Sequence, residues 1–322
     1  METLNTIVTA ISDVVWFPIL VVALVGLGAF SMIYLGFPQF TRFGKSFQQT
    51  FGGMFKKKEE GEVTSMSSFQ ALATAIAAQV GTGNVAGVAT AIFSGGPGAI
   101  FWMWMSALFG MSTIFSEAIL AQKYREVKDG EYIGGPAYYM SKGLKFKGNK
   151  AMAAFFALSL IIALGLIGNL VQSNSISGAV TQVTSLPPIA IGVILAVMAA
   201  LVFIGGMKRI ARFAELVVPF MALLYIVGAV AILIRYGDMV VPTLKSIFVG
   251  AFNPQAIGGG AAGVAVQQAI RFGVARGLFS NEAGMGSTPH AHATANVKHP
   301  VQQGMVAMIG VVIDTGVVCT AT

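Results

Sequence analysis

Long apolar runs dominate this sequence, and they leave too little charge for a surface that faces water. Runs long enough to cross a bilayer fall at residues 14–36, 69–94, 97–121, 151–181, 187–206, 213–234, 256–283 and 304–322. Only 10% of the 322 residues are charged and 55% are hydrophobic, whereas soluble domains carry about 25% charged residues. Because a spanning helix needs about 20 apolar residues, the sequence predicts an all-α polytopic membrane protein with eight spans.

Basic residues fall almost entirely on one side of this predicted bundle. When loops alternate between two sides, every lysine and arginine except Arg235 and Lys245 falls on the side opposite the N-terminus. Basic loops stay in the cytoplasm. We therefore expect a multi-pass plasma (cell) membrane protein with its N-terminus outside and its basic loops inside. The net charge of +7 then reflects membrane orientation, and no nucleic-acid partner is expected. Residues 122–149 and 236–255 are expected to be amphipathic segments on the membrane surface.

Glycine and polar residues interrupt the second apolar run at residues 79–84, QVGTGN. A helix that breaks inside a bilayer frees backbone N–H groups that favour an anion and carbonyls that favour a cation. The alternative is close helix packing through Gly83 and Gly87. We favour a break, because the amides of Gln79 and Asn84 are not needed for packing.

The seventh run is interrupted in a similar way. Its glycine and polar residues are Gly258, Gly259, Gly260, Gly263, Gln267, Gln268, Gly273, Gly277, Ser280, Asn281, Glu282, Gly284 and Gly286. A flexible loop at the cytoplasmic end is the alternative here. Two interrupted helices, five spans apart and oppositely directed, are typical of an inverted-repeat transporter.

This pattern divides the chain into three parts. Residues 1–68 hold an extra N-terminal helix and a cytoplasmic loop, residues 69–235 form the first five-helix repeat, and residues 236–322 begin the second. The last apolar run ends at Thr322 without a flanking loop. We therefore expect a C-terminally truncated fragment whose second repeat is incomplete.

A few polar residues inside the apolar runs need their own interpretation, because such residues are costly in lipid. Glu117 is expected to meet water or the freed backbone amides of a broken helix, and Asp314 to couple an ion or to cap a polar network. Gln172 either lines a cavity or bonds between helices. The spacing of His290 and His292 is a weak metal motif without an evident third ligand, so no metal other than sodium is expected.

Three stretches closely resemble the sodium:alanine symporter family, whose members are alanine or glycine:cation symporters. They are GGPGAIFWMWMSALFG at 95–110, AAQVGTGNVAGVATAI at 77–92 and GVARGLFSNEAGMGSTPHAHA at 273–293. The resemblance implies a five-plus-five inverted repeat of the leucine-transporter-like fold with one extra N-terminal helix. It also implies sodium-coupled uptake of alanine or glycine by alternating access, with Na⁺ as the coupling ion and no cofactor.

The resemblance also suggests where the ligands bind. The implied substrate site is built from Gln79, Thr82, Gly83 and Asn84, with Gln172 and Phe279 as further candidates. Our hypothesis places sodium on backbone carbonyls near Val80 and Gly81, with Asp314 as a coupling candidate. The substrate carboxylate would then meet freed N–H groups around Gly83 and Asn84.

Three other functions were weighed against this one. The first is a proton-coupled amino-acid carrier on the same fold, working through Glu117 or Asp314. The second is a membrane enzyme, which the lack of a nucleophile–base set argues against. The third is a channel, in which broken helices would line a continuous pore.

Overall fold

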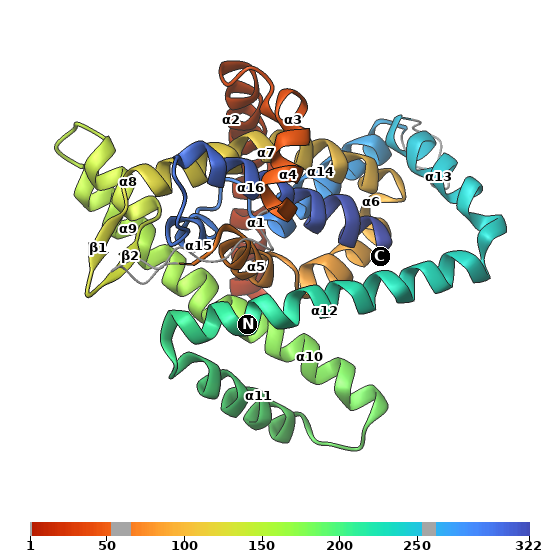
Figure 1. Cartoon of the computed structure of the whole chain (residues 1–322). Helices are drawn as coiled ribbons and strands as arrows, with labels where there is room; N and C mark the ends of the chain where they lie inside the picture. Colours follow the sequence, from red (N-terminus) through yellow and green to blue (C-terminus); the bar gives the residue numbers. More distant parts are fainter. Residues whose placement is uncertain (1, 53–65, 253–261) are drawn as a thin grey trace.

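The structure is a computed structural model that describes residues 2–52, 66–252 and 262–322, and these residues are almost entirely helical (Figure 1). The α-helices are α1 (Glu2–Val14), α2 (Val21–Tyr34), α3 (Pro38–Thr41), α4 (Phe43–Gly52), α5 (Ser68–Gln79), α6 (Val88–Gly95), α7 (Gly98–Lys123), α8 (Pro136–Gly143), α9 (Asn149–Leu160), α10 (Asn169–Val183), α11 (Pro188–Phe203), α12 (Gly206–Arg235), α13 (Gly237–Phe252), α14 (Ala262–Asn281), α15 (Pro289–Ala293) and α16 (Pro300–Val311). Short π-helical segments, η1 (Val15–Leu20), η2 (Gly83–Gly87), η3 (Ile161–Gly168) and η4 (Val312–Cys319), continue several of them.

Four helices in the described residues are long and apolar enough to cross a membrane. They span Gly98–Lys123, Asn149–Val183, Gly206–Arg235 and Pro300–Cys319, and the bent pair Ser68–Gln79 and Gly83–Gly95 makes a fifth if it is counted as one span. The chain is therefore a helical membrane protein, as predicted, and the run at 151–181 is one continuous helix. The count of eight spans, the division into repeats and the orientation stay predictions.

One loop differs from the sequence expectation. Residues 122–149 contain an antiparallel hairpin of β1 (Glu126–Lys128) and β2 (Glu131–Ile133), followed by α8. Asp129 and Gly130 have φ angles of 52° and 76°, which is the backbone of a two-residue hairpin turn. The Asp-Gly pair was thus the signal that the amphipathic interpretation missed. Residues 237–252 of the other loop form α13.

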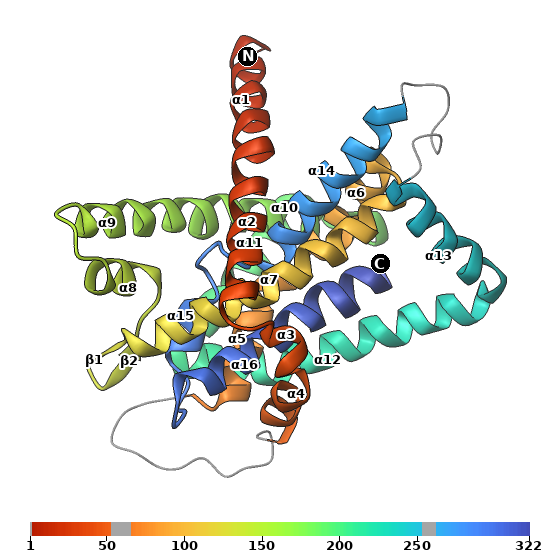
Figure 2. The ribbon, with the colours of Figure 1, turned by 90° about the horizontal axis from the view of Figure 1, so that it is seen from above.

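Helix α7 lies at the centre of the fold, and α2, α14 and α16 pack against it (Figure 2). Met111, Ile114 and Phe115 of α7 form one buried cluster with Met308 and Val311 of α16. Glycine permits the close approach of α14, because a Cβ placed at Gly277 would lie 3.2 Å from the Cα of Met103. These inner helices hold the polar site described below.

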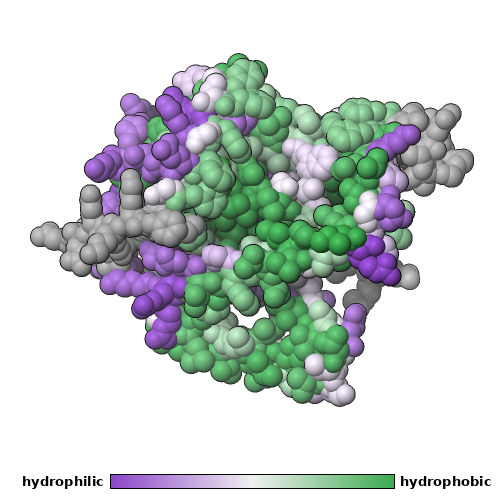
Figure 3. Space-filling model, turned by 45° about the vertical axis from the view of Figure 1, so that its right-hand side comes forward, coloured by the Kyte–Doolittle hydropathy of each residue, from purple (hydrophilic) through white to green (hydrophobic). Residues whose placement is uncertain are grey.

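A second set of helices, α9 to α12, lies outside this core and exposes apolar side chains along its length. Phe155, Ile189, Phe220 and Leu224 are examples, all at least 66% exposed. Figure 3 shows apolar residues over most of the face it presents, with hydrophilic residues gathered mainly toward its left edge. Such surfaces suit contact with lipid.

Candidate functional site

The second apolar run contains a broken helix, as predicted. Helix α5 begins at a capping box made by Ser67 and Gln70 and ends at Gln79, and helical structure resumes at Gly83. Val80 is extended, with φ −84° and ψ 107°, and the two halves meet at a bend of 55°. The predicted interruption is therefore confirmed, at Val80–Thr82.

Asn84 ties the two sides of the break together. Its side-chain Oδ1 accepts a hydrogen bond from the Gly81 backbone N–H at 2.8 Å, and the backbone N–H of Asn84 donates to the Gly81 carbonyl at 3.2 Å. The bent backbone is therefore partly satisfied by a side chain from its own C-terminal half. The Gly81 carbonyl, a predicted sodium ligand, is engaged in this turn.

Asn84 also belongs to a fully buried polar cluster, which we call the Asn84–Asp314 cluster. It comprises Asn84 from η2, Ser280 from the end of α14, and Asp314, Thr315 and Cys319 from η4. The Asn84 Nδ2 donates to Asp314 Oδ1 at 2.5 Å and to Ser280 Oγ at 2.9 Å. Three segments distant in sequence thus meet at one carboxylate.

Asp314 is the centre of this cluster, and among the described residues its hydrogen-bond partners are neutral donors. The Ser280 hydroxyl donates to Oδ2 at 2.9 Å and the Thr315 hydroxyl donates to the same oxygen at 2.8 Å. Asp314 is 0% exposed. A buried carboxylate is costly unless charge or donors compensate it, and a carboxylate with hydroxyl oxygens beside it suits a hard cation. Sequence analysis singled out Asp314 but missed Thr315, whose adjacency to Asp314 was the available signal.

The seventh run differs from the prediction in where it breaks. Helix α14 runs without interruption from Ala262 to Asn281, so Gly273 and Gly277 serve close packing against α7. The interruption comes after Asn281, in residues 282–288. The glycines at 258–260 lie outside the described residues. Arg271 and Arg276, which the charge count placed at the cytoplasmic side, lie within α14.

The end of α14 reaches the first break directly. Gln79 Nε2 donates to the Asn281 carbonyl at 2.6 Å, and the Asn281 side chain donates to Thr315 Oγ1 at 3.4 Å. Gln79 is only 4% exposed, and its Oε1 has no partner among the described residues. A buried amide oxygen without a donor is costly, so Gln79 is available to a ligand that brings a donor.

Glu117 supports the second interruption. Its Oε2 accepts a hydrogen bond from the Gly284 N–H at 3.0 Å, and Gly284 has a φ of +88° that favours glycine. Of the two expected roles, bonding to freed backbone amides is the one confirmed. Glu117 is therefore engaged in holding the loop after α14.

Gln172 comes to the break from the outer helix α10. Its Oε1 accepts a hydrogen bond from the Thr82 N–H at 3.2 Å, and a Cβ at Gly81 would lie 2.5 Å from its Nε2. The side chain therefore fills the space that the glycine leaves and satisfies one freed backbone donor. A substrate carboxylate could accept from the same N–H group.

Phe279 lies beside the other glycine of the break. A Cβ at Gly83 would lie 3.6 Å from Cδ1 and Cε1 of the Phe279 ring. Phe279 as a residue is 41% exposed. With Gln172 and Phe279 in place, the predicted substrate residues gather around the break.

The loop after α14 is anchored at its far end by α7. Gln122 Nε2 donates to the carbonyls of His292 and Ala295, at 2.5 and 3.0 Å, and Arg125 donates to the Ala293 and Ala295 carbonyls. His292 is buried beside Gln303, with 2.8 Å between Nδ1 and Nε2. Burial lowers the pKa of His292 to about 4.

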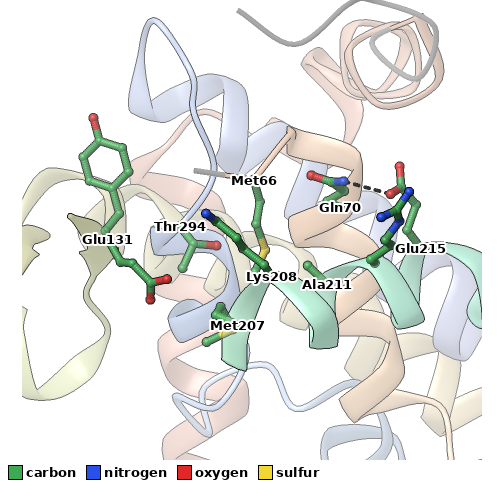
Figure 4. Close-up of a pocket in the computed structure, with 10 residues that line it drawn as sticks. Met66, Gln70, Glu131, Met207, Lys208, Ala211, Glu215 and Thr294 are labelled. Carbon is green, nitrogen blue, oxygen red and sulfur yellow. Dashed lines mark hydrogen bonds between the residues drawn. The ribbon is translucent and has the colours of Figure 1, made fainter. Parts of the chain in front are cut away.

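A separate cavity of about 380 Å³ lies near the start of α5, away from the break (Figure 4). Its lining residues come from α5, α12, β2 and the segment after α15; they are Met66, Gln70, Glu131, Tyr132, Met207, Lys208, Ala211, Arg212, Glu215 and Thr294. Gln70 donates to Glu215 at 2.8 Å across it. None of the predicted site residues lines this cavity.

Comparison with known proteins agrees with these features. The sequence profile described as the sodium:alanine symporter family matches residues 1–322. The chain is 44% identical to the sodium/alanine symporter AgcS of Methanococcus maripaludis, over 98% of this chain and 69% of AgcS. It is 42% identical to the amino-acid carrier protein AlsT of Bacillus subtilis, over 99% and 65%, and 40% identical to the probable sodium/glutamine symporter GlnT of the same organism, over 100% and 65%.

The chain thus spans about two thirds of the length of these relatives. Symporters move solutes across membranes and are not enzymes, in keeping with the apolar helices of this fold. On the match over its whole length, the chain belongs to the sodium:alanine symporter family.

Proposed function

We propose that the protein is a secondary active transporter that carries a small neutral amino acid, alanine or glycine, into the cell together with Na⁺. The observation that carries this proposal is the Asn84–Asp314 cluster, a buried carboxylate surrounded by neutral donors beside a broken helix. The names of AgcS and AlsT agree with an amino-acid cargo, and that of AgcS agrees with sodium and alanine.

Sodium would bind among the oxygens around Asp314 and not on the carbonyls near Val80 and Gly81, because the Gly81 carbonyl already accepts a hydrogen bond from the Asn84 backbone N–H. A cation there would pair with the carboxylate and would displace the Asn84 Nδ2 donor, whose amide can turn to present its oxygen. Such a rotation would change the hydrogen bond between Asn84 and the Gly81 N–H at the break. Occupancy of the cation site would thereby alter the shape of the substrate site, which is a coupling free energy between the two ligands.

The amino acid would bind at the break itself. Its carboxylate would accept from the Thr82 N–H, displacing the Oε1 of Gln172, and from the freed groups around Gly83. Its ammonium would donate to Gln79 Oε1, which has no partner among the described residues. Phe279 beside Gly83 would leave room only for a small side chain.

The proposal also includes the orientation of the chain in the membrane and its division into two repeats. The apolar helices would lie in the cell membrane, with the N-terminus outside and the basic loops in the cytoplasm. The broken helix would begin the first repeat at residues 69–235, and α14, which packs on α6, would belong to the second repeat beginning in 236–322.

Proton coupling on the same fold is the second candidate. It is favoured by the same buried Asp314, because a carboxylate whose partners are neutral donors could be balanced by a proton instead of a cation. The two candidates predict different driving forces for uptake.

The test is uptake of labelled alanine into proteoliposomes that contain the full-length protein. We expect an inward sodium gradient to drive accumulation, and replacement of sodium by choline to abolish it at constant pH. Undiminished uptake in choline, driven instead by a pH gradient, would contradict sodium coupling and would support proton coupling.

A further inference from the structure

The N-terminal helix of the chain reaches the candidate substrate site. Residues 2–34 form one helical rod of α1, η1 and α2, of which α1 projects from the body (Figure 2). The π-helical segment η1 covers Val15–Leu20 and includes Trp16. Single-turn π segments frequently occur at functional positions.

The lower part of this rod is fixed on the inner helices. Val21 is 6% exposed and clusters with Val274 and Leu278 of α14. A Cβ at Gly28 would lie 2.8 Å from the Cβ of Phe109 on α7. Because η1 directly precedes Val21, these contacts fix its position relative to the end of α14.

Trp16 meets Phe279 from this fixed base. Their ring centroids lie 6.5 Å apart with an interplanar angle of 61°, an edge-to-face arrangement. Phe279 in turn lies against Gly83, at 3.6 Å from a Cβ placed there. The order of contact is therefore Trp16, Phe279 and then the break in the helix.

We infer that Trp16 is a positioning residue that holds the Phe279 ring against Gly83 and thereby sets the largest amino-acid side chain that the site accepts. This inference rests on the proposed function. Phe279 is partly exposed, and its edge-to-face contact with Trp16 restrains the ring. Trp16 acts through Phe279 and does not itself touch the substrate.

Removing the indole should change selectivity more than rate. In Trp16→Ala the Phe279 ring can turn away from Gly83, so the space beside the break widens. Because an aromatic pair contributes about 0.5–1.5 kcal/mol, apparent affinity for alanine should fall by about 2- to 10-fold. Affinity for valine or leucine should rise relative to alanine by a similar factor, while the maximal rate stays within about twofold.

The experiment measures competition by unlabelled alanine, valine and leucine for binding of labelled alanine to the purified full-length protein. Trp16→Phe should restore the wild-type order, because a smaller ring can still meet Phe279 edge to face. Phe30→Ala is the matched control. Phe30 lies in the same helical rod, is 63% exposed and stacks on Tyr34, so its removal should leave the order unchanged.

A double variant makes the inference sharper. If Trp16 acts through Phe279, then Trp16→Ala should have no further effect on the valine-to-alanine ratio once Phe279→Ala is present. An unchanged ratio in Trp16→Ala, or additive effects in the double variant, would overturn the inference. Wild-type binding measured with and without sodium tests the proposed function separately, since the ratio among competitors can be read in either ion.

Discussion

The inner and outer helices of this protein differ in a way that composition alone would not suggest. In the most apolar stretches of α7 and of α16 with η4, 67% of the residues are buried, whereas the figure is 6% for the outer helices α9–α10 and α12. Yet the outer helices are the more apolar ones. In a soluble protein the most apolar helices are the most buried ones.

The inversion fits lipid as the solvent. The outer helices can expose leucine, isoleucine and phenylalanine because hydrocarbon is no less apolar than they are. The inner helices carry the glycines that allow close approach and the polar groups that only a protein interior can satisfy. In the sequence, long apolar runs therefore indicate the outer helices, and glycine and polar residues within such runs indicate the site.

The largest expected effect is the loss of the buried carboxylate of the inner region. Asp314→Ala leaves the Asn84 amide and the hydroxyls of Ser280 and Thr315 without their acceptor and removes the charge that would balance sodium. Since truncating one partner of a buried charge pair at a binding site costs about 2–5 kcal/mol of binding free energy, sodium-dependent alanine uptake should fall by about 100-fold or more. Asp238→Ala, an exposed acid in the first turn of α13, is the control, and equal uptake by the two variants would contradict the account.

Two asparagines test whether the effect of a polar side chain on alanine binding depends on its position in the inner or the outer helices. Asn84 is fully buried at the break, whereas Asn169 is exposed and donates to the Gly165 carbonyl in its own helix at 2.7 Å. Asn84→Ala should reduce alanine binding by about 10-fold or more, because buried partners are left unpaired. Asn169→Ala should change it less than about twofold. A normal dissociation constant for Asn84→Ala, measured by equilibrium binding, would remove Asn84 from the site.

A pair of glycines tests the packing difference. A Cβ at Gly277 would meet the backbone of α7, whereas one at Gly228 of α12 would meet nothing within 4 Å. Gly277→Ala should lower the free energy of unfolding by about 1–3 kcal/mol through overpacking. Gly228→Ala should raise it by about 0.5–1 kcal/mol, because alanine is the better helix former. Denaturation in detergent measures both, and the same sign for both would refute the distinction.

A pH dependence of stability is expected from His292. Burial lowers its pKa to about 4 from an ordinary value near 6.5. The folded protein therefore keeps the imidazole neutral, while the unfolded chain takes up a proton as the pH falls below about 6.5. Stability should decline between pH 6.5 and 4 by at most about 3 kcal/mol. His292→Gln should flatten this decline, and an equally steep decline in that variant would assign it to other groups.

The sequence predicted the helical class and the first break, but not every detail of the site. Long apolar runs and the QVGTGN segment are local signals, and the break they predicted lies where expected. The second interruption was predicted too broadly, over residues 258–286, because glycine serves equally for a break and for close packing. Within the described residues it lies at 282–288. Which role a glycine has depends on the element packed against it, and Gly273 and Gly277 face α7.

The Asn84–Asp314 cluster was beyond sequence reasoning for a related reason. Asn84 and Asp314 are 230 positions apart in the chain. The sequence singled out Asn84 for the substrate site and Asp314 for ion coupling, but it did not predict that the two side chains are in contact. Their meeting depends on how α14 and α16 pack on α7. The approach of Gln172 to Gly81 likewise depends on the path of α10, an outer helix whose local sequence gives no contact information.

The central claim is that sodium and the amino acid bind on either side of Asn84 and strengthen each other's binding. Its most direct test is the dissociation constant of labelled alanine on the purified full-length protein, measured over a range of sodium concentrations with choline keeping ionic strength constant. The account predicts that alanine binds at least about tenfold more tightly in saturating sodium, and that alanine raises sodium affinity by the same factor. An alanine dissociation constant that is the same in sodium and in choline would contradict it.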